Sequence, residues 1–586
     1  MNHKIDRDTY IIPPNFIESG TFFGGMFKAR NVIEAGILAF AIGVPVFSLL
    51  PLGLTARIIA LCLTALPAAL VALIGISGES LSSFLLIFLK YLRNRRIVGG
   101  NSAEDAVPAA EHGGKHIKKK AHKPDKAPRR SRRSGREDFP AEFDEVRSYE
   151  IRQKLRPVKK QKPAQEKKTA KQKKKVSKER KVKRPIRTQE PKPACLNPVA
   201  DYLPISKIEN GIIYTKDHRY VKVVEVVPIN FMLRSAQEQR NIIYSFVSYL
   251  KISPIKLQIK VLTRRAEINR HLDTVRKEME QETNEQCLLM QEDYLQFVQQ
   301  IGSREAITRR FFLIFEYEPW SNTKRSDEEG EAINALQSAV HTATNYLRQC
   351  GNEVIVPENW DEFTVDVLYN LLCRNESAVK PLSVRAQEVV AEYLAKGRDS
   401  EIDHIPATEF CAPKSIDFTH GHHICIDGLY YAYLLVPSDG YKTQVPAGWL
   451  SLIVNAGDGI DMDMFLSRQP KETIIQKVGQ QLRINRSKIK DASDTNTDFD
   501  DIDGAIRSGY FLKEGLANNE DFYYLNLLIT ITASNEEDLE WKVSEMKKLL
   551  LSQDMNACTC HFREEQAFLS ALPLVAMEKK LYERGV

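Results

Sequence analysis

The sequence predicts a membrane helical hairpin followed by a larger α+β body, with a disordered basic linker between them. Three observations carry this prediction. Two long apolar stretches lie near the start, a cation-rich segment with few apolar residues follows, and the remainder alternates strand-like and helix-like periodicities. At 586 residues the chain is long enough for several domains of roughly 150 residues. We expect the body to contain two ferredoxin-like β-α-β modules.

The two apolar stretches cover residues 32–52 and 58–76 and are joined by a short link. A helix needs about 20 mostly apolar residues to cross the hydrocarbon core, and both stretches come close to that length. Glu34 is the one charged residue inside them, near the start of the first stretch. We therefore predict two transmembrane helices. The alternative left open by the sequence is a helical hairpin buried in a soluble core.

Positive charge gathers on the outer flanks of the hairpin. Lys28 and Arg30 precede it, Lys90 and three arginines follow it by residue 96, and the link carries only Arg57. Because cytoplasmic flanks are enriched in Lys and Arg, we expect both flanks in the cytoplasm. The chain would then be a two-span protein of the cell membrane, with residues 1–30 and its bulk in the cytoplasm. The polar residues before the first span argue against a cleaved signal peptide.

A third apolar stretch, residues 81–92, is too short to span a bilayer and ends in cations. Such a pattern is typical of an amphipathic helix that lies in the membrane interface. We expect this helix along the inner face, where it completes a membrane segment of residues 31–98.

Residues 99–196 form the predicted disordered linker. Between 114 and 193 there are 31 Lys and Arg and 10 Asp and Glu, a net charge of +21. The whole chain carries +7, so the remaining residues carry −14 (7 − 21). The segment has too few aromatic and branched apolar residues to build a core. The candidate contact residues lie in its densest basic runs: Lys118, Lys119, Lys120, Arg129, Arg130, Arg132, Arg133, Lys173, Lys174 and Lys175.

Three roles for the linker stay open. Cations near an anionic leaflet contribute about 1 kcal/mol each, and the second span lies close enough in the chain to favour lipid binding. Nonspecific nucleic-acid binding would weaken steeply with salt, and the basic runs carry no aromatic residue for base stacking. The third role is a solvated tether.

The first α+β module is expected at residues 197–375. We predict strands at 220–227, 256–262 and 310–316, and helices at 235–250, 267–282, 285–300, 326–350 and 360–373. A charged helical connector at 376–400 would separate it from the second module.

The second module is expected at residues 401–586. We predict strands at 449–454, 461–466, 523–532 and 556–562, and a helix at 471–490. Another helix should begin at Ser534-Asn-Glu-Glu537, which has the pattern of a capping box.

Signatures of catalysis are missing from the sequence. A phosphate-binding loop needs G-x-x-x-x-G-K-[ST], and the one Gly-Lys pair, Gly114-Lys115, lies in the linker. The strand ending at Glu316 resembles a Walker B strand but has no such loop as a partner. The acidic run 498–504 does not fit a calcium loop in register, so we expect a solvated loop at 491–503. Short Cys and His motifs at 420–425 and 558–561 read as strands. We therefore expect no catalytic, cofactor or metal site.

Two parts of the chain resemble conjugation families. Residues 9–98 resemble PrgI-family membrane proteins of Gram-positive conjugative elements, through Tyr10-Ile-Ile-Pro-Pro-Asn15, Gly24-Gly25, Arg30-Asn31 and Glu34-Ala35. Residues 197–586 resemble the amino-terminal region of VirB-type conjugative ATPases of the TraC/TraE class. The motifs are Asp201-Tyr-Leu-Pro204, Gly211-Ile-Ile-Tyr214, Arg309-Arg-Phe-Phe-Leu-Ile-Phe-Glu316, Gly448-Trp-Leu450 and the run 564–573.

The resemblance implies a membrane-anchored scaffold subunit of a type IV secretion apparatus for conjugative DNA transfer. In the ATPase family a motor domain follows the point where this sequence stops, at Val586. We therefore expect no enzyme activity here and a separate ATPase as partner, beside other channel subunits and membrane lipids. DNA and further copies of the chain are additional partners left open. The alternative function is a membrane-attached, nonspecific nucleic-acid-binding protein that acts through the linker.

Overall fold

The computed structural model describes residues 9–11, 21–22, 27–49, 53–76, 80–100, 195–265, 269–280, 282–304, 307–317, 328–438, 440–442, 444–446, 448–491 and 498–577. Statements below concern these residues. The ten linker cations predicted as contact residues lie outside them.

The two apolar stretches form helices α1 (Ala29–Leu49) and α2 (Leu54–Ile74), which pack against each other as a hairpin. The Asn31 side chain donates to the carbonyl of Leu73 across the pair, at 3.2 Å. Both helices are long and apolar enough to cross a membrane, and 11% of each apolar window is buried. A hairpin in a soluble core would be mostly buried, so this exposure disfavours that alternative.

Short strands flank the hairpin. Before it lie β1 (Thr9–Ile11), which pairs with β14 (Gln444–Pro446), and the small pair β2 (Thr21–Phe22) and β3 (Phe27–Lys28). After it come helix α3 (Leu81–Asn94) and strand β4 (Ile97–Gly99). The predicted short helix at 81–92 is therefore present.

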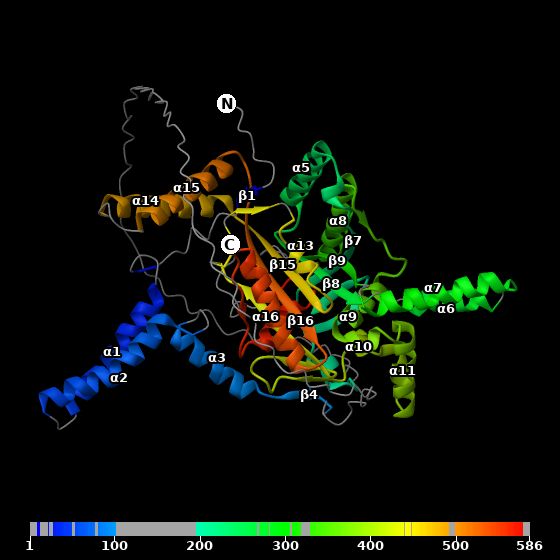
Figure 1. The fold of residues 1–586 in the computed structure, drawn as a ribbon, viewed down its shortest axis with the longest axis horizontal. Coiled ribbons are helices and arrows are strands. Elements are labelled where there is room, and N and C mark those ends of the chain that lie inside the picture. The colour runs from blue at the N-terminus through cyan, green and yellow to red at the C-terminus, as the bar shows by residue number, and fades with distance from the viewer. Residues whose placement is uncertain are drawn as a thin grey trace, which may run out of the picture. The chain divides into compact units, whose positions relative to one another are not determined.

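A single large antiparallel sheet organises the body (Figure 1). Its main path runs in the order β4, β11 (Ser415–Asp417), β12 (Ile424–Ile426), β13 (Leu429–Val436), β16 (Phe522–Ala533), β15 (Ile460–Gln469), β8 (Lys256–Arg265), β9 (Ile307–Tyr317), β7 (Tyr220–Val227), β6 (Ile212–Thr215) and β5 (Ile205–Glu209). Two further strands lie off this path: β10 (Glu353–Val354) pairs with β7, and β17 (Cys558–Thr559) pairs with β13. The predicted α+β class is confirmed.

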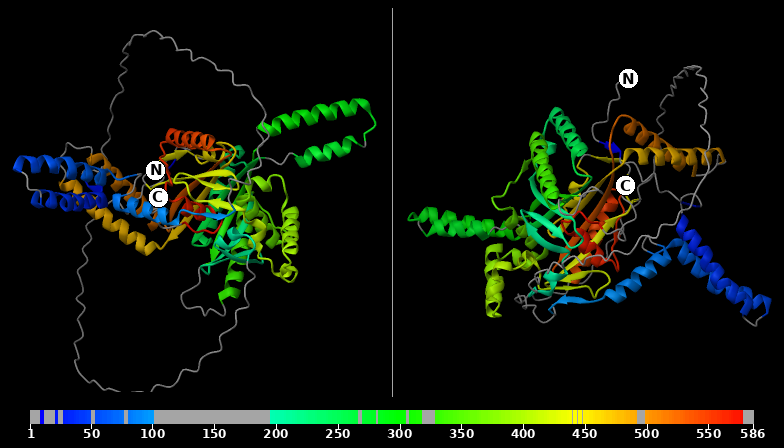
Figure 2. Two further views of the ribbon diagram at one scale, coloured as in Figure 1. Left: turned by 90° about the horizontal axis from the view of Figure 1, so that it is seen from below. Right: turned by 180° about the vertical axis from the view of Figure 1, so that it is seen from behind.

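The two halves of the sheet have the same strand order. In the first half the order is β10-β7-β9-β8, and in the second it is β17-β13-β16-β15. Each half also carries a helical hairpin between its second and third strands in sequence. These are α6 (Asn269–Met279) with α7 (Glu285–Arg304), and α14 (Lys471–Asp491) with α15 (Asp498–Ala517). Figure 2 shows α6 and α7 running side by side. The ferredoxin-like assignment itself stays a prediction.

The halves are joined where β8 pairs with β15, along a buried polar seam. Lys260 Nζ lies 2.8 Å from Asp463 Oδ2, and both side chains are almost fully buried. The Gln258 amide donates to the other carboxylate oxygen of Asp463, also at 2.8 Å. Asp461 accepts from the backbone N–H of Thr263 at 2.8 Å. One sheet therefore runs through both predicted modules.

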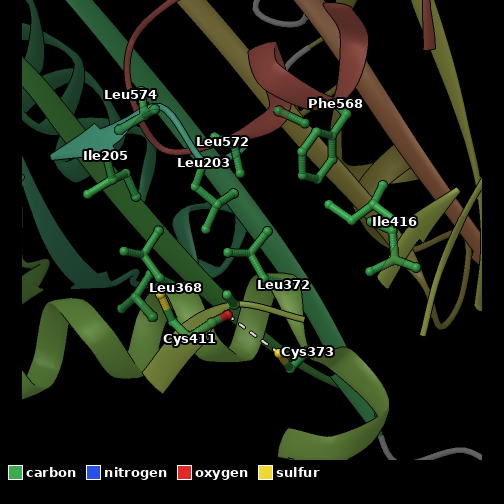
Figure 3. Close-up of a cluster of buried hydrophobic side chains, with 14 of the residues drawn as sticks. Leu203, Ile205, Leu368, Leu372, Cys373, Cys411, Ile416, Phe568, Leu572 and Leu574 are labelled. Carbon is green, nitrogen blue, oxygen red and sulfur yellow. Dashed lines mark hydrogen bonds between the residues drawn. The ribbon is translucent and has the colours of Figure 1, made fainter. Parts of the chain in front are cut away.

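Helices cover both faces of this sheet because its central strands alternate apolar side chains on both sides. One face packs against α5 (Ala236–Ile252), α8 (Glu328–Gln349) and α16 (Glu536–Ser552). The other face packs against α9 (Trp360–Leu372), α12 (Ala407–Cys411) and α17 (Glu564–Ala571). Figure 3 shows side chains from both halves in this second core, including Leu203, Leu368, Ile416 and Phe568.

The remaining short elements are α4 (Pro198–Tyr202), η1 (Phe231–Leu233), α10 (Arg374–Ser377), α11 (Leu382–Ala395), η2 (Asp399–His404) and α13 (Ser451–Val454). Helix α5 begins with a reciprocal capping box: the Ser235 hydroxyl accepts from the N–H of Glu238, and the Glu238 carboxylate accepts from the N–H of Ser235. This cap fixes where the helix starts.

Three local predictions are wrong. The strand expected at 449–454 is partly the short helix α13, because a brief apolar run does not distinguish strand from helix. Helix α16 is capped by Asn535, whose side chain accepts from the N–H of Asp538 at 2.7 Å, and not by Ser534. The acidic run from Asp498 opens helix α15 instead of lying in a solvated loop, since carboxylates are favoured at a helix N-terminus. The strand expected at 556–562 shortens to β17.

The linker leaves and rejoins the body at one place. Strand β4 ends at Gly99, which pairs with Ser415 of β11. At the return, the Asn197 side chain donates to the carbonyl of Pro413 at 2.8 Å, and the Glu409 carboxylate accepts from the N–H of Leu196. Both ends of the linker are thus held against the segment 409–415.

Candidate functional site

The most elaborate junction in the described residues joins α3 and β4 to the body. Phe84, Phe88 and Tyr91 lie along one side of α3, three or four residues apart. Their ring centroids lie 5.9, 5.2 and 5.1 Å from that of Phe562. The Tyr91 hydroxyl also donates to the carbonyl of Thr419, at 2.5 Å. Aromatic pairs in this range contribute about 0.5–1.5 kcal/mol each beyond their burial, so the helix is held by an aromatic cluster.

A polar cluster around Glu565 extends the junction. Its carboxylate accepts from Arg96 at 3.0 Å, from the Tyr202 hydroxyl at 3.0 Å and from the Asn94 amide at 3.3 Å. The Arg96 guanidinium also lies over the Tyr202 ring, 5.4 Å from its centroid. Burial raises the pKa of the Tyr202 hydroxyl, and the nearby Glu565 carboxylate raises it further. Tyr202 therefore stays a neutral donor across the physiological range.

The junction is also tied to the apolar hairpin. Glu34 of α1 accepts from the Ser82 hydroxyl at 2.6 Å and from the Ser82 backbone N–H at 3.1 Å. The second bond satisfies one of the unpaired amides in the first turn of α3. The sequence singled out Glu34 only as a charge within an apolar stretch. The structure shows it capping the next helix.

A second apolar face of α3 is left exposed. Leu85, Leu86, Leu89 and Leu92 are each about half exposed or more, and Arg93 and Arg95 are exposed at the same end of the helix. The helix thus presents one apolar face to the body and another to its surroundings.

Phe562 owes its position to an unusual turn. Its φ of 60° lies in the left-handed region, which a bulky residue rarely adopts. Its backbone N–H donates to the carbonyl of Gly421 and to the Glu564 carboxylate, both at 3.1 Å. A Cβ on Gly421 would lie 2.6 Å from the Phe562 ring, so only glycine permits this approach. The turn and the loop around Gly421 therefore form one unit.

The electrostatics of the turn are dominated by burial. Glu564 is 4% exposed, and desolvation raises the pKa of its carboxyl to about 9. Burial lowers the pKa of His423 and of His561. The surroundings therefore favour the uncharged forms of these three groups at neutral pH.

The structure also places the Walker B-like strand and the two Cys and His motifs that the sequence singled out. Glu316, the acid of the Walker B-like strand, is almost fully buried, with Arg219 at 3.6 Å and Lys256 at 3.7 Å. The two Cys and His motifs meet in space, since His422 Nδ1 lies 2.9 Å from His561 Nδ1. Within the described residues, no group of three or more His, Cys, Asp or Glu side chains is placed to hold a metal ion.

Comparison with known proteins finds a family similarity in the first half of the body. A family model described as the archaeal TraC-like domain matches residues 206–344, which run from β5 into α8. No curated protein matches the chain. The similarity indicates involvement in a conjugation or type IV secretion system. It confirms the TraC-like part of the resemblance, while the PrgI-like part and its Gram-positive setting stay predictions.

Sequence reasoning missed the residues of the junction. Only the amphipathic pattern at 81–92 pointed to α3, and nothing local marked Phe562 or Glu565 as its partners. The motif 564–573, quoted for the family resemblance, begins two residues after Phe562.

Proposed function

We propose that this chain is a membrane-anchored structural subunit of a type IV secretion apparatus for conjugative DNA transfer. The observation that carries the proposal is one continuous sheet. This sheet includes the strands of the TraC-like segment 206–344. Its edge strand is β4, which follows the apolar helices in the chain.

The proposed anchor consists of α1 and α2 in the bilayer and α3 at its cytoplasmic surface. The exposed leucines of α3 would face the acyl boundary, and Arg93 and Arg95 would contact headgroups. Strand β4 starts three residues after α3 ends, so little free chain separates the anchor from the sheet. The body is therefore presented at the inner membrane surface in a defined orientation.

The proposed partner of the body is a separate ATPase. The similarity to a TraC-like domain supports this, because the resemblance places such a region next to a motor in one polypeptide. The sequence contains no phosphate-binding loop, so we assign nucleotide hydrolysis to the partner and a docking role to this chain. Neighbouring channel subunits would assemble on the same body.

The test is co-purification from membranes of the native host. Tagged full-length chain should resist carbonate extraction and retain a P-loop ATPase after mild detergent solubilisation. The matched control is the Phe562→Ala variant in the same membranes, which should remain in the membrane because it leaves α1 and α2 intact. Recovery of the wild-type chain in the carbonate supernatant, or membranes that yield no P-loop ATPase, would contradict the proposal.

The nucleic-acid alternative rests on the linker charge of +21. Deletion of residues 114–193 separates the two functions. Under our proposal the deleted chain keeps its ATPase partner and its membrane location. Under the alternative it loses a salt-sensitive DNA affinity that the intact chain shows, and no ATPase accompanies either form.

A further inference from the structure

The loop Phe418–His423 holds α3 and Phe562 at the same time. Thr419 accepts the Tyr91 hydroxyl of α3, and Gly421 accepts the N–H of Phe562. The Phe562 ring lies between Gly421 and the aromatic side of α3. Displacing this loop would therefore loosen α3 in two places at once.

A histidine pair bridges this loop to the turn that carries Phe562. His422 Nδ1 and His561 Nδ1 are 2.9 Å apart, a hydrogen bond that needs one nitrogen with a proton and one without. If both imidazoles are protonated, two N–H groups and two positive charges face each other at that distance. The bridge then becomes repulsive.

Two further histidines lie in the loop Phe418–His423. His420 and His423 stack with centroids 4.5 Å apart. His423 Nδ1 lies 3.7 Å from Glu536, and His420 Nε2 lies 4.0 Å from Asp417. The Glu536 and Asp417 carboxylates both favour the charged form of His423.

A buried carboxyl lies on the other side of Phe562. Glu564 lines a cavity of about 40 Å³ together with Ile87, Tyr91, Phe418 and Phe562. Ionisation of Glu564 would place a negative charge in this small cavity, where its carboxylate accepts from the N–H of Phe562 at 3.1 Å. Burial in this cavity therefore favours the neutral form of Glu564, although the charge of Arg563 opposes this.

We propose that the α3 junction is a proton-sensitive latch: it is closed when the His422–His561 bridge carries at most one proton and Glu564 is protonated. Acid opens it by charging the histidine pair, and alkali opens it by charging Glu564. Lowered pKa values of His423 and His561 and the raised pKa of Glu564 agree with this arrangement.

Charged groups from every neighbouring element enter the balance. Lys90 of α3 and Arg563 of the turn line the cavity beside Glu564. Lys547 of α16 disfavours the charged form of His561. The nearby carboxylates are Asp417, the last residue of β11, and Glu536 of α16, and both lie nearest to the stacked histidines. The positive charges nearest the His422–His561 bridge favour opening of the latch in acid, since they make a second proton on the bridge more unfavourable.

Photo-crosslinking of the full-length chain in nanodiscs of uncharged lipid tests the latch, because benzophenone chemistry does not depend on pH in this range. Ile87→p-benzoylphenylalanine places the probe in the cavity, and mass spectrometry reads its link to residues 560–566. We expect the yield to fall at least threefold from pH 7.5 to pH 5.5. The same probe at Leu86, on the exposed face, should give no such link. An equal yield at both pH values would overturn the proposal.

The His422→Asn/His561→Asn variant keeps a hydrogen-bonding pair that does not titrate, so its yield should be the same at pH 7.5 and pH 5.5. The control His341→Asn, on α8, should respond like the wild type. A pH response that survives in the double variant would refute the role of the pair. If the double variant does not crosslink at all, the wild-type titration still decides.

Glu564→Gln tests the alkaline limb. The wild-type yield should fall at least threefold between pH 7.5 and pH 10, and the variant should keep its yield. An alkaline loss of the same size in Glu564→Gln would show that another group opens the junction. Far-UV circular dichroism at each pH should be unchanged, which distinguishes latch opening from unfolding of the body.

Discussion

The buried pair Lys260–Asp463 offers the sharpest test of the continuous sheet. It lies where β8 of the first half pairs with β15 of the second, and Lys260 also donates to the carbonyl of Ala571 at 2.9 Å. Removing one partner of a buried pair costs about 3–5 kcal/mol, because the other charge stays buried without compensation. Lys260→Met should therefore destabilise the body strongly.

The magnitude can be worked out for the melting temperature. Unfolding entropy is about 2.1 cal/mol/K per residue, so a body of roughly 380 residues that unfolds as one unit gains about 0.8 kcal/mol/K. A loss of about 3–5 kcal/mol then lowers Tm by roughly 4–6 °C. The exposed pair Lys548–Glu545 supplies the control: Lys548→Met should shift Tm by less than about 1 °C.

The pH dependence of the melting temperature provides an independent test of the Lys260–Asp463 pair. Burial raises the pKa of the Asp463 carboxyl to about 6, although Lys260 opposes this. A raised folded-state pKa contributes stability that is full below the unfolded value and is lost as pH rises through the folded value. In the wild type most of this loss has occurred once the pH exceeds about 6. In Lys260→Met the pKa of Asp463 should rise further, so the Tm of the variant should fall by more than that of the wild type between pH 6.5 and pH 8.5.

Differential scanning fluorimetry in detergent measures all of these shifts. The double variant Lys260→Met/Asp463→Leu replaces both charges by apolar groups and leaves Gln258 bonded to the carbonyl of Leu572. It should recover most of the lost Tm, since apolar replacements of buried pairs are often neutral. A single variant that melts like the wild type, or a double variant no more stable than the single, would refute the reasoning.

Three further predictions concern single side chains. Asn535→Ala should lower the stability of α16 by about 1 kcal/mol, measured by thermal unfolding, while Ser534→Ala should not; the reverse result would restore the capping box expected from sequence. Glu34→Gln should speed hydrogen exchange in the first turn of α3 by weakening its acceptor, and unchanged exchange there would contradict the cap. In Gly421→Ala the new methyl group would lie 2.6 Å from the Phe562 ring, so the ring should move and amide hydrogen exchange in β4 should become faster. The control Gly504→Ala, whose methyl group meets nothing within 4 Å, should leave this exchange unchanged. Equal effects of the two substitutions would count against the close approach.

Local patterns predicted much of this fold. The apolar stretches predicted α1 and α2, and the helical pattern at 471–490 predicted α14. Strong alternation gave β7 and β16 within a few residues. These features succeed because the burial of one face or stripe dictates the residue types along a single element.

The junction could not be predicted in the same way, because its parts come from four segments that are far apart in the sequence. His422 and His561 are 139 residues apart, and Tyr202 and Glu565 are 363 apart. Phe562 also adopts a left-handed conformation that no local preference of phenylalanine favours. The pairings of β4 with β11, of β11 with β12 and of β13 with β17 bring these segments together in the fold.

The common anchoring of the linker's two ends has a consequence for protein engineering. Because Gly99 and Asn197 both contact the segment 409–415, the chain between them is an insertion at one place in the body. Closing a flexible loop costs only about 0.6 kcal/mol more for each doubling of its length. A fluorescent reporter protein inserted between Gly99 and Asn197 should therefore leave the fold of the body intact and report where the chain is located in the cell.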